Sequence, residues 1–275
     1  MHRPNPMLVC LQELEQMDKD SGTISPIFSV VTGDVMPLSK TDEMLATQNW
    51  TLYFPVPGNH DLDAKHKVDS IAAHVRGLGF PHVEEGPECS PKLTNYAIEM
   101  PLISTSLIII NTFAKDRECP EMIAHWLDDQ LRSSLSQWKL VFGHSPIHSE
   151  RRVLLASQTW SRMSKFHEVL TRSNATAYFC GHSHDILSFG NGPSSYLEIN
   201  AGKLNRGSKP TRRHPSGRQQ SIVVVDIVPN QLGIRLWSRA DVNEPIREVG
   251  KHKLQTRIPK YADATTRAVP DLPRL

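Results

Sequence analysis

Four short polar sequences in this chain each follow an apolar run and carry side chains that can bind a metal ion or transfer a proton. They are Gly33-Asp34, Gly58-Asn59-His60-Asp61, Gly143-His144 and Gly181-His182-Ser183-His184. Carboxylate and amide oxygens and imidazole nitrogens suit borderline divalent cations. An imidazole next to a carboxylate can also donate a proton to a leaving group. These residue types therefore predict a metal site with a nearby acid.

Each of these residues, taken singly, also has an ordinary structural explanation. Aspartate and asparagine after a strand are typical turn residues, and a histidine there is more often a satisfied core or surface residue than a ligand. Taken together, the candidates all follow predicted strands of one α/β pattern, which makes coincidence the poorer account. The candidate metal ligands are Asp34, Asn59, His144, His182 and His184.

Buried strands are the elements that must position these residues. Apolar runs predict strands at residues 27–31, 51–54, 138–142 and 175–180, each followed closely by one of the polar sequences. A further strand within residues 106–111 is apolar on both faces, as a central strand must be. Open α/β sheets bind their ligands beyond the carboxyl ends of their strands. The four polar sequences are therefore expected at one edge of a sheet.

Helical periodicity and turn residues define the remaining elements. The sequence predicts helices at residues 5–18, 66–77, 120–135 and 158–172. Residues 80–91 are expected to be a loop, and residues 95–99 pair with the central strand through a turn at Pro101. Strands at residues 196–199, 221–228 and 233–238 are expected to form a mostly antiparallel flank.

Composition limits the class of protein. The chain has 275 residues, enough for one large α/β domain, and a formal net charge of +2, so nucleic acid is not indicated as a partner. Its 4 cysteines show no C-x-x-C spacing, which excludes a zinc ribbon and a thioredoxin-like motif. No apolar run approaches the roughly 20 residues of a membrane span. The basic stretch 203–218 is either a solvated loop or a rim near an anionic substrate.

The order and context of the four polar sequences resemble the signature of the calcineurin-like metallophosphoesterase superfamily over residues 25–240. Residues 139–147 and 176–182 are most similar to the tartrate-resistant (purple) acid phosphatase branch. The resemblance implies a four-layer α/β/β/α sandwich with two mixed β-sheets. That domain would span residues 1–254, followed by a disordered tail at residues 255–275.

The same resemblance implies an enzyme that hydrolyses phosphate mono- or diesters with two divalent ions, either Mn, Fe or Zn. Asp34 would bridge the ions, and His184 would belong to the second metal site. The first metal site would be completed by Asn59, His144 and His182. A hydroxide bridging the metals would attack phosphorus, while His60 acts as general acid and Asp61 orients it.

Two departures from the superfamily pattern affect this expectation. The superfamily begins with a strand ending in Asp-x-His, and nothing before Asp34 offers that motif. The N-terminal strand is therefore expected to be absent, and the ion near His184 to be held weakly. Pro37 stands where the purple branch has an iron-binding tyrosine, so no tyrosinate-iron absorption is expected.

Two interpretations remain open at this point. The first is a phosphoesterase acting on a phosphorylated small molecule or another phosphoester, which the retained His60 and the four ligands of the first metal site favour. The second is a catalytically weak or silent relative that acts as a binding or regulatory module, which the missing first motif favours. The sequence assigns neither a substrate nor a compartment nor an oligomeric state.

Overall fold

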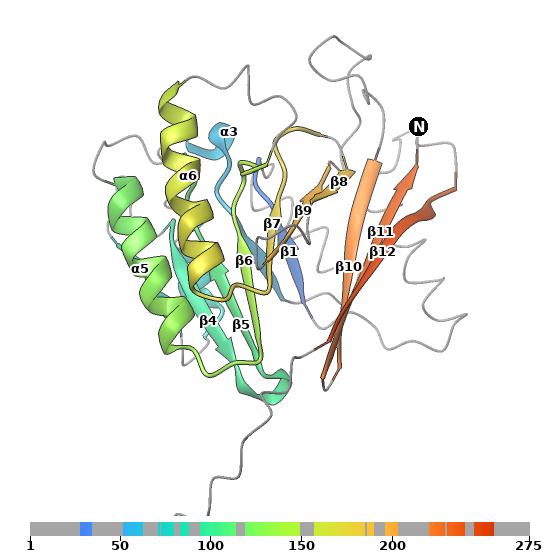
Figure 1. The fold of residues 1–275 in the computed structure, drawn as a ribbon, viewed down its shortest axis with the longest axis horizontal. Helices are drawn as coiled ribbons and strands as arrows, with labels where there is room; N and C mark the ends of the chain where they lie inside the picture. The colour runs from blue at the N-terminus through green and yellow to red at the C-terminus, as the bar shows by residue number, and fades with distance from the viewer. Residues whose placement is uncertain are drawn as a thin grey trace, which may run out of the picture.

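A mixed seven-stranded sheet lies at the centre of the computed structural model (Figure 1). The structure describes residues 28–34, 52–62, 71, 73–79, 83–87, 94–113, 119–148, 157–184, 186–189, 196–202, 220–228, 230–239 and 245–255. The order in the central sheet is β3-β4-β5-β6-β7-β9-β8. Its strands are β3 (Val83–Glu85), β4 (Tyr96–Met100), β5 (Thr105–Ile109), β6 (Trp138–Phe142), β7 (Ala177–Cys180), β8 (Ile186–Phe189) and β9 (Leu197–Ala201).

The middle of this sheet is parallel, which brings several strand ends to one edge. β5, β6, β7 and β9 pair in parallel in that order, whereas β3, β4 and β8 join as antiparallel strands. The loops after β6 and β7 therefore leave the sheet side by side. Those loops are the ones that carry Gly143-His144 and Gly181-His182.

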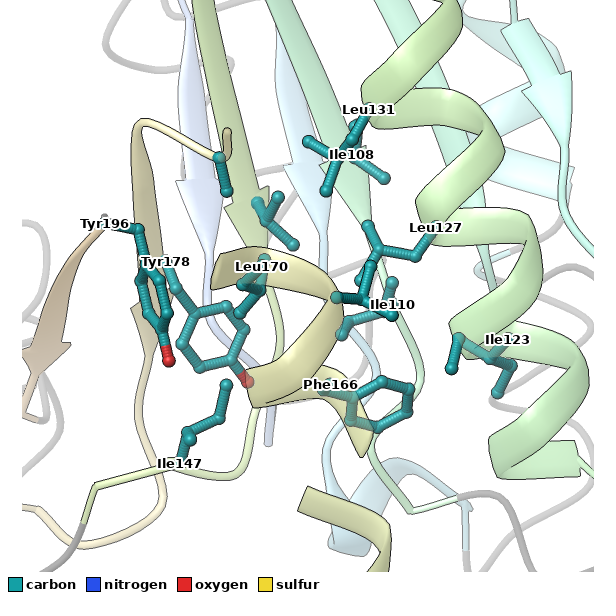
Figure 2. Close-up of a cluster of buried hydrophobic side chains, with 14 of the residues drawn as sticks. Ile108, Ile110, Ile123, Leu127, Leu131, Ile147, Phe166, Leu170, Tyr178 and Tyr196 are labelled. Atoms are coloured by element: carbon teal, nitrogen blue, oxygen red, sulfur yellow. The ribbon is translucent and has the colours of Figure 1, made fainter. Parts of the chain in front are cut away.

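Helices α5 (Cys119–Ser133) and α6 (Ser157–Arg172) cover one face of the central sheet (Figure 1). In α5, the spacing of Ile123, Leu127 and Leu131 places three buried side chains on one face of the helix. Figure 2 shows these side chains pointing toward the sheet, where they form the first core cluster. Its largest members also include Ile108, Ile110, Phe166, Leu170 and Tyr178.

Two smaller sheets form the core on the opposite face. β1 (Ser29–Val31) and β2 (Tyr53–Pro55) pair in parallel, and β10 (Gln220–Val228), β11 (Gln231–Arg239) and β12 (Arg247–Gln255) form an antiparallel sheet. Every second residue of β11 is buried, because one face of that sheet packs inward. The second core cluster joins this side to the central sheet, with members that include Phe54, Ile98, Leu140, Phe179, Ile199 and Ile234.

This architecture confirms an α/β fold with packed sheets and a layer of helices. The outer helical layer on the far side of the smaller sheets stays a prediction. The expected helix at residues 5–18, the basic stretch 203–218 and the tail after Gln255 lie outside the described residues. In the described part of the chain, no helix is long and apolar enough to cross a membrane.

Two expectations about the strands were wrong. Residues 80–91 are not all loop, because the short strand β3 extends the central sheet there by pairing with β4. The strand at residues 196–199 does not belong to an antiparallel flank with β10 and β11. Residues 197–199 are the first part of β9, which pairs in parallel with β7 and so lies beside one of the histidine-bearing loops.

Candidate metal centre

Asp34 reaches the site through a sharp turn that follows β1. Gly33 and Asp34 both have positive φ angles, 95° and 55°, and the amide of Gly33 donates to the carbonyl of Val31 at 2.9 Å. A Cβ atom on Gly33 would lie 2.2 Å from Nδ1 of His144. Glycine is therefore required here by both conformation and space. The turn brings the carboxylate of Asp34 against the loop that follows β6.

The second polar sequence forms a tight turn that leads from β2 into the short helix α3 (Asn59–Leu62). The carboxylate of Asp61, which is 2% exposed, accepts the amide of Gly58 at 2.8 Å. The amide of His60 donates to Oδ1 of Asp34 at 3.0 Å, while the residue itself is exposed. Asp61 thus closes the turn, and the backbone of His60 joins it to Asp34.

His144 is held so that one of its ring nitrogens points at the other candidate ligands. Its Nδ1 lies 2.6 Å from the carbonyl oxygen of Thr32, which can only accept, so Nδ1 carries the proton. In the neutral ring, Nε2 then presents a lone pair. This Nε2 lies 3.3 Å from Oδ2 of Asp34 and 3.2 Å from Oδ1 of Asn59. A backbone carbonyl on the far nitrogen is a common device for orienting a metal-binding histidine.

His182 approaches the same point from the loop after β7. Its φ angle is 66°, and its Nδ1 lies 3.1 Å from Oδ1 of Asn59 and 3.2 Å from Nε2 of His144. The amide of Gly181 donates to the carbonyl of His144 at 3.0 Å, which ties the two loops together. The ring of Phe113 packs on both imidazoles, with centroid distances of 5.6 Å to His144 and 5.3 Å to His182.

The donor set fits a divalent cation. Oxygen and nitrogen ligands of a tetrahedral ion bound at about 2.0–2.2 Å lie about 3.3–3.6 Å from one another. The measured separations around Nε2 of His144, 3.2 and 3.3 Å, lie close to that spacing. Within the described ranges, no set of three or more His, Cys, Asp or Glu side chains is by itself arranged as a metal site. The side-chain oxygen of Asn59 lies near both imidazoles and so adds a further donor to the pair His144 and His182.

The carboxyl group of Asp34 is ionised under ordinary conditions. Burial opposes its charge, but the hydrogen bond and the positive charge of a protonated His144, together with the amide and the charge of His60, outweigh burial and lower the pKa of Asp34 to about 2. When the His144 ring is neutral, its Nε2 lone pair and the ionised carboxylate are both donors that suit a divalent cation.

The structure therefore brings together four of the five expected metal ligands, namely Asp34, Asn59, His144 and His182. His184 lies two residues further along the same loop, at a positive φ of 63°. Sequence reasoning did not identify Thr32, Phe113 or Asn200 as parts of this site. The side-chain Nδ2 of Asn200 donates to Oγ of Ser183 at 2.6 Å and so supports the loop between the two histidines.

Comparison with known protein families shows to which family the chain with this arrangement belongs. The family described as calcineurin-like phosphoesterase matches residues 10–185, which include every candidate ligand. The chain belongs to the calcineurin-like phosphoesterase family.

Individual relatives are distant. The chain is 24% identical over 149 residues to tartrate-resistant acid phosphatase type 5 from Sus scrofa, a match that covers 50% of this chain and 40% of that protein. Among solved structures, GAP50, described as the anchor in the inner membrane complex of Plasmodium, has a TM-score of 0.56 at 13% identity; the match covers 94% of this chain and 87% of that one. A putative 5'-nucleotidase from Staphylococcus aureus has a TM-score of 0.47 at 13% identity, with coverages of 98% and 52%. The GAP50 likeness shows the same fold.

Proposed function

We propose that this calcineurin-like phosphoesterase hydrolyses phosphate mono- or diesters at the edge of the central sheet. The observation that carries the proposal is the convergence of Asp34, Asn59 and His182 around Nε2 of His144. These residues would hold one divalent ion of Mn, Fe or Zn. His184 would contribute to a second ion. Bound cations of this kind neutralise the charge of a phosphate ester and activate water as a nucleophile.

The residues of the chain then orient the substrate and handle the proton. His60 is exposed, and its backbone is fixed to Asp34 by the 3.0 Å hydrogen bond, so its imidazole is carried beside the site. As water adds to phosphorus and the ester P–O bond breaks, His60 gives a proton to the departing oxygen. Asp61 contributes by closing the turn that carries His60, through its bond to Gly58.

The experiment is a hydrolysis assay with 4-nitrophenyl phosphate and bis(4-nitrophenyl) phosphate in the presence of Mn²⁺. His60→Ala should keep metal binding but lose roughly 10²–10⁴-fold in turnover, the usual contribution of a general acid. Asn59→Ala should lose both metal affinity and turnover. His125→Ala, at an exposed position on α5, is the control and should behave as the wild type.

A second function has one observation in its favour. GAP50 has the same fold as this chain and is described as an anchor. A protein with this fold can therefore have an attachment role. Equal rates for the wild type, His60→Ala and Asn59→Ala would refute the phosphoesterase proposal and favour a binding or regulatory module.

A further inference from the structure

A buried carboxylate next to the metal centre has no place in the proposed chemistry. Glu198 lies on β9 and is 1% exposed. Its oxygens accept the amide of Ile147 at 2.9 Å and the amide of His148 at 3.0 Å. Nδ1 of His148 lies 2.6 Å from Oε2 of Glu198, so this carboxylate also binds the imidazole. Glu198 thus binds residues 147 and 148, which follow closely after Gly143-His144.

Other neighbours also fix the described part of the loop after β6, residues 143–148. The amide of Ser145 donates to Oγ1 of Thr112 at 3.0 Å, and the hydroxyl of Tyr178 donates to the carbonyl of Ser145 at 2.7 Å. Figure 2 shows the side chains of Tyr178 and Ile147 lying close together in the first core cluster. The amides of Ile147 and His148 are held by Glu198. Residues 147 and 148 are therefore fixed by a charged side chain.

Burying a carboxylate is unfavourable, so Glu198 depends on the hydrogen bonds that it forms at this position. A carboxylate removed from water must be satisfied by hydrogen bonds, and here the amides of Ile147 and His148, Nδ1 of His148 and Sγ of Cys180 all lie within hydrogen-bonding distance of Glu198. An apolar residue in its place would leave two buried amides without this acceptor, which carries its own penalty. Glu198 also extends the contact beyond the loop, because the ring of His148 packs edge-on against His167 at 4.9 Å between centroids.

We propose that Glu198 is a positioning residue for the metal centre. By fixing the loop of residues 143–148, it keeps Nε2 of His144 aimed at Asp34 and Asn59. The inference rests on the proposed function, because it assigns to Glu198 an effect on the metal affinity of that site. The residues that support a metal ligand from behind commonly contribute 10–100-fold to affinity.

The experiment measures Mn²⁺ binding by calorimetry for the wild type, Glu198→Gln and Glu198→Ala. Gln keeps the volume and one carbonyl acceptor, so its affinity should fall by roughly tenfold, whereas Ala should lose up to roughly 100-fold. Asp128→Asn is the matched control. Asp128 is also a buried carboxylate with several donors, but it lies between α5 and α6, so its replacement should leave Mn²⁺ affinity unchanged.

Hydrogen–deuterium exchange of the loop 143–148, measured without metal, gives an independent readout. Exchange at Ile147 and His148 should increase in both Glu198 variants and stay at the wild-type level in Asp128→Asn. Unchanged affinity and unchanged exchange in Glu198→Ala would overturn the inference. A wild-type chain that binds no Mn²⁺ would instead remove the proposed metal centre, and the exchange result would then decide whether Glu198 holds the loop.

Discussion

At the scale of single residues, the site depends on close approaches that leave no room for a side chain. Gly33 lies against the ring of His144, and Gly58 lies against Asp34. A Cβ atom on Gly58 would lie 2.3 Å from the amide nitrogen of Asp34 and 2.4 Å from its Oδ1. The first contact is with backbone, which cannot move aside as the end of a flexible side chain can. Gly58 therefore sets how closely the two polar turns approach each other.

Gly58→Ala should displace Asp34 and weaken Mn²⁺ binding. The extra methyl group should also lower the free energy of unfolding by about 1–3 kcal/mol, the usual cost of overpacking. Gly77→Ala is the control, since nothing lies within 4 Å of its Cβ position. In the helical segment 73–77, that change should be neutral or stabilise by up to about 1 kcal/mol. Calorimetric Mn²⁺ titration and urea unfolding test both variants, and equal Mn²⁺ affinities would contradict this account of Gly58.

At the scale of elements, the sequence was sufficient to predict the turns that short stretches of neighbouring residues determine. The turns around Asp34, Asn59 and His144 were found because glycines, polar residues and apolar strands follow one another in the chain. β3 and the pairing of β9 were missed, because a strand's neighbours are set by residues far away in sequence. The bond between Glu198 and the loop 143–148 spans about fifty positions, and no local pattern indicates it.

Helices α5 and α6 are joined by a charged contact whose contribution to stability depends on pH. Asp128 on α5 accepts hydrogen bonds from Arg172 and Ser173, at the end of α6, and from Arg132 on its own helix. Burial by itself would raise the pKa of Asp128, but the bonds from Ser173, Arg172 and Arg132 outweigh it and lower the pKa to about 2 from an ordinary value of 3.8. The folded state therefore favours the ionised form.

This contact should add stability above pH 3.8 and lose its contribution as the pH falls toward 2. Asp128→Asn removes the charge, so the variant should be less stable than the wild type at neutral pH and approach it near pH 2. Urea unfolding at several pH values measures the difference. A gap in unfolding free energy that stays constant down to pH 2 would show that the charge of Asp128 does not contribute.

At the scale of the whole molecule, the central sheet is shared by two core clusters. Ile123 on α5 belongs to the cluster beneath the helices, and Ile234 on β11 belongs to the cluster on the opposite face. The same strands contribute to both, since Ile108 faces the helices whereas Leu107 and Ile109 face the smaller sheets. Neither cluster can be lost without exposing one face of the strands that hold the metal ligands. The shared sheet therefore predicts one cooperative folding unit, as expected for a single domain.

Ile123→Ala and Ile234→Ala test this prediction as a matched pair, because both side chains are fully buried at 0% exposure. Each should lower the free energy of unfolding by about 2–5 kcal/mol, the usual cost of an Ile→Ala cavity. If the molecule unfolds as one unit, each substitution lowers the midpoint of a single unfolding transition. Circular dichroism and tryptophan fluorescence then give the same midpoint for each variant. Mn²⁺ should raise that midpoint in the wild type and in both variants, because the ion binds only the folded state. Separate transitions for the helical side and for the β11 side would instead show that the two clusters unfold independently.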